Sequence, residues 1–173
     1  MTTQTTNSEI QIELKNTFVS LIESLSSLTD TQLNQLPFEG SWTAGQLGDH
    51  LLKSYARIET MKTNAEAGNR PADKNCASIK GLFLDFGKKF PANPFIIPDG
   101  GPFKKEELIG ALRNRTNEVL DFVQNEDLTK ICNDIDLPGW GYMSNLEWIT
   151  LFLYHTQRHL RQLEGIKKII VHS

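Results

Sequence analysis

Four segments of this 173-residue chain repeat apolar residues with the period of an α-helix, and this pattern limits the fold more than any other feature. In the first segment, Leu14, Phe18 and Leu21 fall on one face of the expected helix. Four amphipathic helices of this length favour an all-α fold, a four-helix bundle formed by a single domain over residues 1–173. The expected helices run from about Ser8 to Leu28, Thr43 to Gly68, Pro102 to Gln124 and Ser144 to Ile170.

Two of these helices carry a start signal. Thr43-Ala-Gly-Gln46 and Ser144-Asn-Leu-Glu147 have the form of a capping box, in which side chains satisfy the free N–H groups of the first turn. Signals for strands are weak, because no segment sustains an apolar–polar alternation and no Asn-Gly or Asp-Gly turn joins two β-branched runs.

Two connections are unusually long for a chain of this size. Residues 69–103, between the second and third helices, are expected to contain a short helix near residues 78–88 and then a stretch rich in Pro and Gly. Residues 126–143 lead directly into the fourth helix. Such loops either close a pocket or serve as a simple crossover, and the sequence leaves both readings open.

Composition excludes several classes of function. The net charge of −3 argues against general nucleic-acid binding, which needs a basic surface. The N-terminus lacks the pattern of a signal peptide, and no apolar run is long enough to span a bilayer. Cys76 and Cys132 form no CxxC pair, so we expect a reduced, cytoplasmic protein with inert thiols and no membrane partner.

The histidines are the candidate functional residues. His155 and His159 lie four positions apart, so their side chains share one face of the fourth helix, and a helical wheel turns that face inward. His50 lies at the flank of the apolar stripe of the second helix, whereas His172 is expected to be exposed near the end of the chain. Three inward imidazoles suggest one shared divalent cation; three separate histidines in ordinary hydrogen bonds are the alternative.

Two familiar metal classes do not fit. Thr156 stands where a zinc protease of the HExxH type needs its glutamate. No Glu is followed three residues later by a His, which argues against a carboxylate-rich di-iron site. The helical wheel places Gln162 near the histidine pair as a candidate partner for a ligand, with an exposed Gln as the alternative. Arg158 points away and is expected to pack or to form a salt bridge.

The segments Ser41-Trp-Thr-Ala-Gly-Gln-Leu-Gly-Asp-His50 and His155-Thr-Gln-Arg-His159-Leu-Arg-Gln162, the second preceded by Glu147-Trp148, resemble motifs of the DinB/YfiT-like family of metal-dependent proteins. The resemblance covers nearly the whole chain, with residues 69–103 as a departure. It implies an up-down-down-up four-helix bundle in which His50, His155 and His159 bind a divalent ion, nickel or zinc by preference and manganese or iron as alternatives. The family's characterised members include S-transferases and an isomerase that depend on low-molecular-weight thiols.

Three protein ligands with an open position are typical of a catalytic metal rather than a structural one. Our first hypothesis is therefore an enzyme that acts on a small-molecule substrate by thiol S-transfer or hydrolysis, with a thiol as cosubstrate. One alternative is a non-catalytic metal-binding or stress-response module, which could form a homodimer. Another is a helical partner-binding protein without metal. Trp140 and Tyr142 either line the pocket mouth or pin the preceding loop to the helices, and the second reading is preferred.

Overall fold

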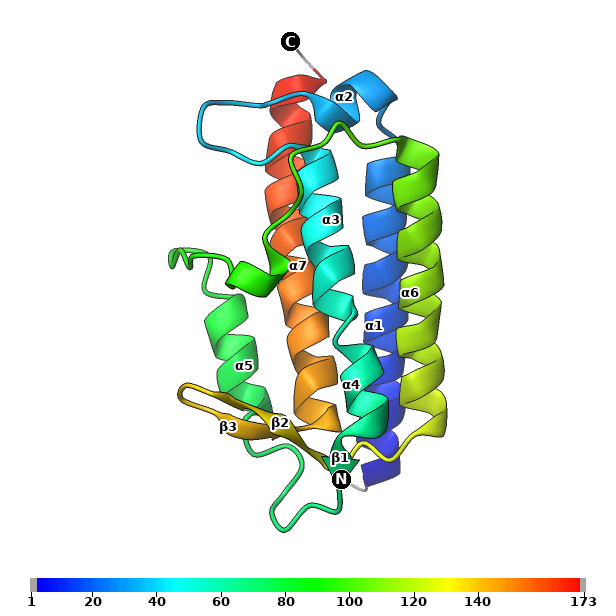
Figure 1. Ribbon diagram of the computed structural model, residues 1–173, viewed down its shortest axis with the longest axis vertical. Helices are drawn as coiled ribbons and strands as arrows, with labels where there is room; N and C mark the ends of the chain where they lie inside the picture. Colours follow the sequence, from blue (N-terminus) through cyan, green and yellow to red (C-terminus); the bar gives the residue numbers. More distant parts are fainter. Residues whose placement is uncertain (1–2, 172–173) are drawn as a thin grey trace.

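The structure, a computed structural model that describes residues 3–171, is mostly helical and includes one small sheet (Figure 1). Four long helices lie side by side, and α1 and α3 each contact both α6 and α7. Their bounds are α1 Thr3–Ser26, α3 Ala44–Tyr55, α6 Lys105–Asn125 and α7 Asn145–Ile170. The shorter elements are α2 Asp30–Asn34, α4 Ile58–Thr63, α5 Cys76–Phe83 and the 3-10 helix η1 Pro94–Ile96. His172 lies outside the described residues.

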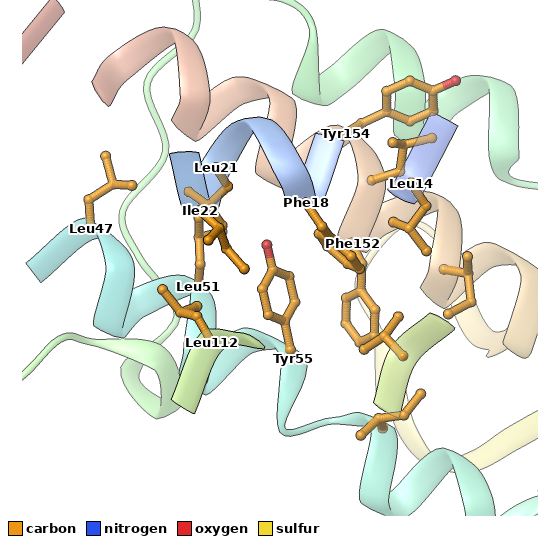
Figure 2. Packing of buried hydrophobic residues seen from close by; sticks show 14 of the residues in the cluster. Leu14, Phe18, Leu21, Ile22, Leu47, Leu51, Tyr55, Leu112, Phe152 and Tyr154 are labelled. Atoms are coloured by element: carbon orange, nitrogen blue, oxygen red, sulfur yellow. The ribbon is translucent and has the colours of Figure 1, made fainter. Parts of the chain in front are cut away.

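The apolar stripes seen in the sequence form the core between these helices. Leu14 and Leu21 of α1 are fully buried, and so are Leu51 of α3 and Leu112 of α6. Figure 2 shows side chains from α1, α3, α6 and α7 around Tyr55, whose ring packs edge-on against the ring of Phe18. Burial of this apolar surface is the main stabilising contribution to the helical body.

Both predicted capping boxes are confirmed. Thr43 and Ser144 are the N-caps of α3 and α7, and each accepts a hydrogen bond from the main chain three residues later. A third box at Thr29 begins α2. The helix expected up to Gly68 instead divides into α3 and α4 and ends at Thr63. Gly68 does not end a helix but allows a close approach between two segments. A Cβ at this position would lie 2.8 Å from the main-chain oxygen of Thr129.

The chain is mostly helical, as expected, but three short antiparallel strands that the sequence did not indicate form a sheet in the order β1-β2-β3. The strands are β1 Ala65–Glu66, β2 Ile131–Leu137 and β3 Gly141–Ser144. The β2–β3 hairpin turns at Gly139, which has a φ of +88°. The hairpin gives no alternating pattern, because β2 is buried only at its first two residues and is mostly exposed after them.

The connection 69–103 folds against the helices. Its helix α5 packs on α7 and runs from Cys76 to Phe83, earlier than the predicted 78–88. Glu147 anchors its start: the fully buried carboxylate forms a salt bridge with Arg70 at 2.7 Å and accepts a hydrogen bond from the Asn75 main chain, also at 2.7 Å. The Ser144 main chain donates to the same carboxylate at 2.8 Å. Every helix within residues 3–171 is too short or too polar to cross a lipid bilayer.

Candidate metal centre

The structure brings the three predicted histidines together where α3 and α7 pack side by side. His155 Nε2 lies 3.0 Å from His50 Nε2 and 2.9 Å from His159 Nε2. The candidate ligand atoms of all three side chains lie within 4.8 Å of one another, and all three side chains are buried. Helix α7 supplies two of them from one face because they are four residues apart, and α3 supplies the third.

Hydrogen bonds on the far side of two rings decide which nitrogen faces the centre of the cluster. His50 Nδ1 lies 2.7 Å from the main-chain oxygen of Ile96, and His159 Nδ1 lies 2.9 Å from Oε1 of Gln162. Both oxygens only accept, so both Nδ1 atoms carry the proton and both Nε2 atoms present a lone pair. This is how outer partners orient histidine ligands in metal sites.

His155 cannot satisfy both neighbours by itself. If its Nε2 carried a proton, that N–H could donate to one neighbouring Nε2 and would leave the other contact without a hydrogen. Its Nδ1 lies 3.3 Å from the Ser54 hydroxyl, which can donate or accept and therefore permits either tautomer. A cation between the rings resolves the conflict, since it accepts all three lone pairs. The donor set therefore suits a divalent ion that prefers imidazole, such as zinc or nickel.

Burial keeps the imidazoles neutral, which is the form that binds metal. Desolvation lowers the pKa of His159 to about 3 and is the largest cause of the lowered pKa of His50 and His155 as well. The nearby charge of Arg158 lowers the pKa of His155 and His159 further. In the metal-free protein, all three rings therefore remain uncharged at neutral pH.

One face of α3 fixes the strap formed by residues 96–99 beside the cluster. His50 bonds the Ile96 oxygen, and Lys53 donates to the Ile97 oxygen at 3.0 Å. The Asp99 main chain donates to Asp49 Oδ2 at 2.8 Å. Lys53 lies four residues after Asp49 and three after His50, so one face of α3 both presents a histidine and fixes the strap that orients it.

Gln162 and Ser54 are the two side chains that contact ring nitrogens of the cluster from outside. The sequence reasoning proposed Gln162 and missed Ser54, which lies four residues after His50 on the same face of α3 and could have been found from that spacing. The Ile96 contact is made by a main-chain oxygen, so no residue type could have indicated it.

Arg158 does not point away from the histidine pair as expected but lines the same cavity, and it packs rather than forming a salt bridge among the described residues. Its guanidinium donates to the main-chain oxygens of Phe83, Asp85 and Lys88, which follow or end α5. It also lies 4.9 Å from the centre of the Phe90 ring. Arg158 therefore fastens the connection to α7. Because the three acceptors are neutral main-chain oxygens, they leave its positive charge without a negative partner.

The histidine cluster opens into a cavity of about 980 Å³ between α3, α7, α5 and the strap. Trp140 lines this cavity and also donates from Nε1 to the Ser78 hydroxyl at 3.0 Å, so it both contacts the pocket and pins the hairpin to α5. Tyr142 is not among the described residues that line it, and about half of its side chain is exposed. Residues 69–103 therefore help to enclose a pocket rather than only crossing over the helices.

Neither cysteine is placed to act as a nucleophile. Neither forms a disulfide. Burial is the main reason that the pKa of both thiols is raised, that of Cys132 to about 11. Neither lines the cavity. Thiol chemistry at this cluster therefore requires a thiol from outside the chain.

Comparison with known proteins agrees with this arrangement. The family model of the DinB superfamily matches residues 13–163. An uncharacterised protein of Bacillus subtilis strain 168, YuaE, is 25% identical over 157 residues, which cover 84% of this chain and 90% of YuaE. No solved structure matches.

Proposed function

This chain belongs to the DinB superfamily, and from that premise we propose that it is a metal-dependent enzyme that acts on small molecules, by thiol S-transfer first and by hydrolysis second. The observation that carries the proposal is the convergence of three buried Nε2 atoms, two of them held in the ligand tautomer, beside an open cavity. His50, His155 and His159 would hold one divalent ion, with nickel or zinc favoured over manganese or iron.

An ion held by these three histidines would supply a thiolate or an activated water at neutral pH. The chain's own residues have separate tasks. Ile96 and Gln162 hold two imidazole protons away from the centre, and aromatic side chains form much of the cavity wall beside the histidines. The raised thiol pKa values of the two cysteines favour a low-molecular-weight thiol as the nucleophile over a cysteine of the chain.

The test is a conjugation assay with common cellular thiols and an electrophilic acceptor, with nickel, zinc or manganese added to untagged protein. We expect metal-dependent turnover that is lost in His155→Ala and in His159→Ala while both variants stay folded. The variants should stay folded because the core of the helical body does not depend on the ion, and circular dichroism checks this. If the variants unfold, the histidines are structural. Metal binding without turnover with any thiol or hydrolysable ester supports the alternative, a non-catalytic metal-binding or stress-response module.

The remaining parts of the proposal concern the setting of the site. We assign the helices to the up-down-down-up bundle of the superfamily, in a single domain, and we propose a cytoplasmic protein that works on small molecules as a monomer or homodimer. Sedimentation at micromolar concentration separates the last two. Neither state changes the ligand set, because all three histidines come from one chain.

A further inference from the structure

The cavity beside the histidine cluster has a chemistry of its own. We propose that it selects an organic anion with a flat, apolar body: the body lies between the aromatic side chains, and the anionic group faces Lys89, Arg158 and Arg161. This inference rests on the proposed function only in taking the cavity as the place where substrate binds. It adds a substrate class that the three histidines do not determine.

The aromatic residues of the chain are concentrated in this cavity. All three tryptophans and six of the nine phenylalanines line it. Phe95 of η1 is 90% exposed, and Phe86 and Phe90 are each 42% exposed, so a substantial aromatic surface is in contact with water at the cavity. Exposed aromatic surface of this extent, gathered at one concave site, is typical of a pocket that receives a flat apolar ligand.

The charges in the cavity all have the same sign. Five cationic residues line it, and none of its described lining residues is Asp or Glu, although acidic residues outnumber basic ones in the whole chain. Lys53 and Arg57 are neutralised by aspartates that lie outside the lining: Lys53 pairs with Asp99 at 2.7 Å, and Arg57 pairs with Asp134.

The other three cations keep their charge. Among the described residues, no carboxylate pairs with Arg158, Arg161 or Lys89; the nearby Asp85 pairs with Lys88 instead. Arg158 is held by main-chain oxygens, and Arg161 lies 4.4 Å from the centre of the Phe86 ring. Stacking on the ring holds the Arg161 guanidinium in place while its N–H groups stay available to a ligand. Arg158 already donates from both terminal nitrogens to neutral main-chain oxygens, so it contributes mainly its unpaired positive charge.

Helix α7 places the two kinds of group together. His155, Arg158, His159 and Gln162 follow one another at steps of three, one and three residues, so they share one face of the helix. A ligand held by its anionic group at the arginines therefore lies alongside the histidine cluster. An uncharged or cationic ligand of the same shape would leave the guanidinium groups without a partner, or would be repelled by them.

The experiment measures binding of phenylbutyrate, phenylbutyramide and phenylbutylamine to metal-free protein, because a carboxylate cannot then be held by a metal ion. Calorimetry gives the affinities, and tryptophan fluorescence locates binding, since every tryptophan lines the cavity. We expect phenylbutyrate to bind at least about tenfold more tightly than the amide, with the amine weakest and with the preference reduced by salt. The double variant Arg161→Gln/Lys89→Gln is expected to bring the preference below about threefold.

The matched control is Arg113→Gln, which removes an exposed cation of α6 that does not line the cavity and is expected to leave the preference unchanged. Equal affinity for the acid and the amide, no binding of the acid at millimolar concentration, or a preference that survives in the double variant would overturn the inference. Protein that binds metal normally but shows no anion preference refutes this inference alone. An anion preference in protein that binds no metal refutes the proposed function alone.

Discussion

Replacing Glu147 with Gln tests how the long connection is fastened beside the histidine cluster. The carboxylate is fully buried and accepts four hydrogen bonds: two from Arg70, at 3.0 and 2.7 Å, and one each from the main chains of Asn75 and Ser144. A Gln side chain of the same shape keeps one acceptor oxygen and turns an NH2 group toward donors on the other side. It also leaves the Arg70 charge without its partner.

Breaking a buried ion pair by removing one partner costs about 3–5 kcal/mol. Because the Arg70 side chain is 18% exposed, water partly compensates, and we take the lower end, about 3 kcal/mol. For a chain of this size, that loss lowers the melting temperature by about 6–12 °C.

Denaturant unfolding of Glu147→Gln measures the loss, and hydrogen exchange at residues 70–76 locates it. Glu107→Gln is the matched control, because Glu107 pairs with Lys104 on the open surface and its replacement is expected to change stability little. A loss below about 1 kcal/mol for Glu147→Gln, or a loss equal to that of the control, would refute the anchoring role.

Three further predictions concern the cluster and the sheet. Ser54→Ala is expected to weaken metal binding about tenfold, the low end for an outer partner, because its contact with His155 is long; calorimetry with zinc measures it. The pKa of His159 is about 3 when folded and near 6.5 when unfolded, so the unfolded state takes up a proton as pH falls from 6.5 to 5. Metal-free wild type should therefore lose about 1–2 kcal/mol more over this range than His159→Gln, as measured by urea unfolding at the two pH values. Gly68→Ala should lower the free energy of unfolding by about 1–3 kcal/mol, because its Cβ would lie too close to the main chain. Gly81→Ala, with open space around it, should stabilise α5 slightly. Equal effects of the two substitutions in urea unfolding would contradict this.

The helices and the histidine face were predictable because both depend on local spacing. A buried helix face repeats every three or four residues whatever it packs against, so Leu14 and Leu21 could be recognised as core without knowing their neighbours. The same spacing placed His155 and His159 on one inward face. Two polar residues at the start of α3 and of α7 identified their capping boxes in the same way.

The sheet and the strap were not predictable because their contacts join distant segments without leaving a pattern. β2 pairs with β1 far back in the chain and with β3 in a local hairpin, and most of its side chains are exposed, so no alternation of apolar and polar residues indicates either pairing. His50 is oriented by the main-chain oxygen of Ile96, and a main-chain contact constrains no side chain in the sequence. The division at Ala56 between α3 and α4 was missed because no Gly or Pro marks it in the sequence.

The three-histidine metal centre is tested by the metal content of untagged protein, determined by elemental analysis after dialysis against nickel or zinc. We expect about one ion per chain for the wild type and a loss of the ion in His155→Ala. His172→Ala, which changes the histidine that the sequence predicts to be exposed near the end of the chain, should keep the ion. A content far below one ion per chain that metal addition does not restore, or equal content in the His155→Ala and His172→Ala variants, would contradict the three-histidine metal centre.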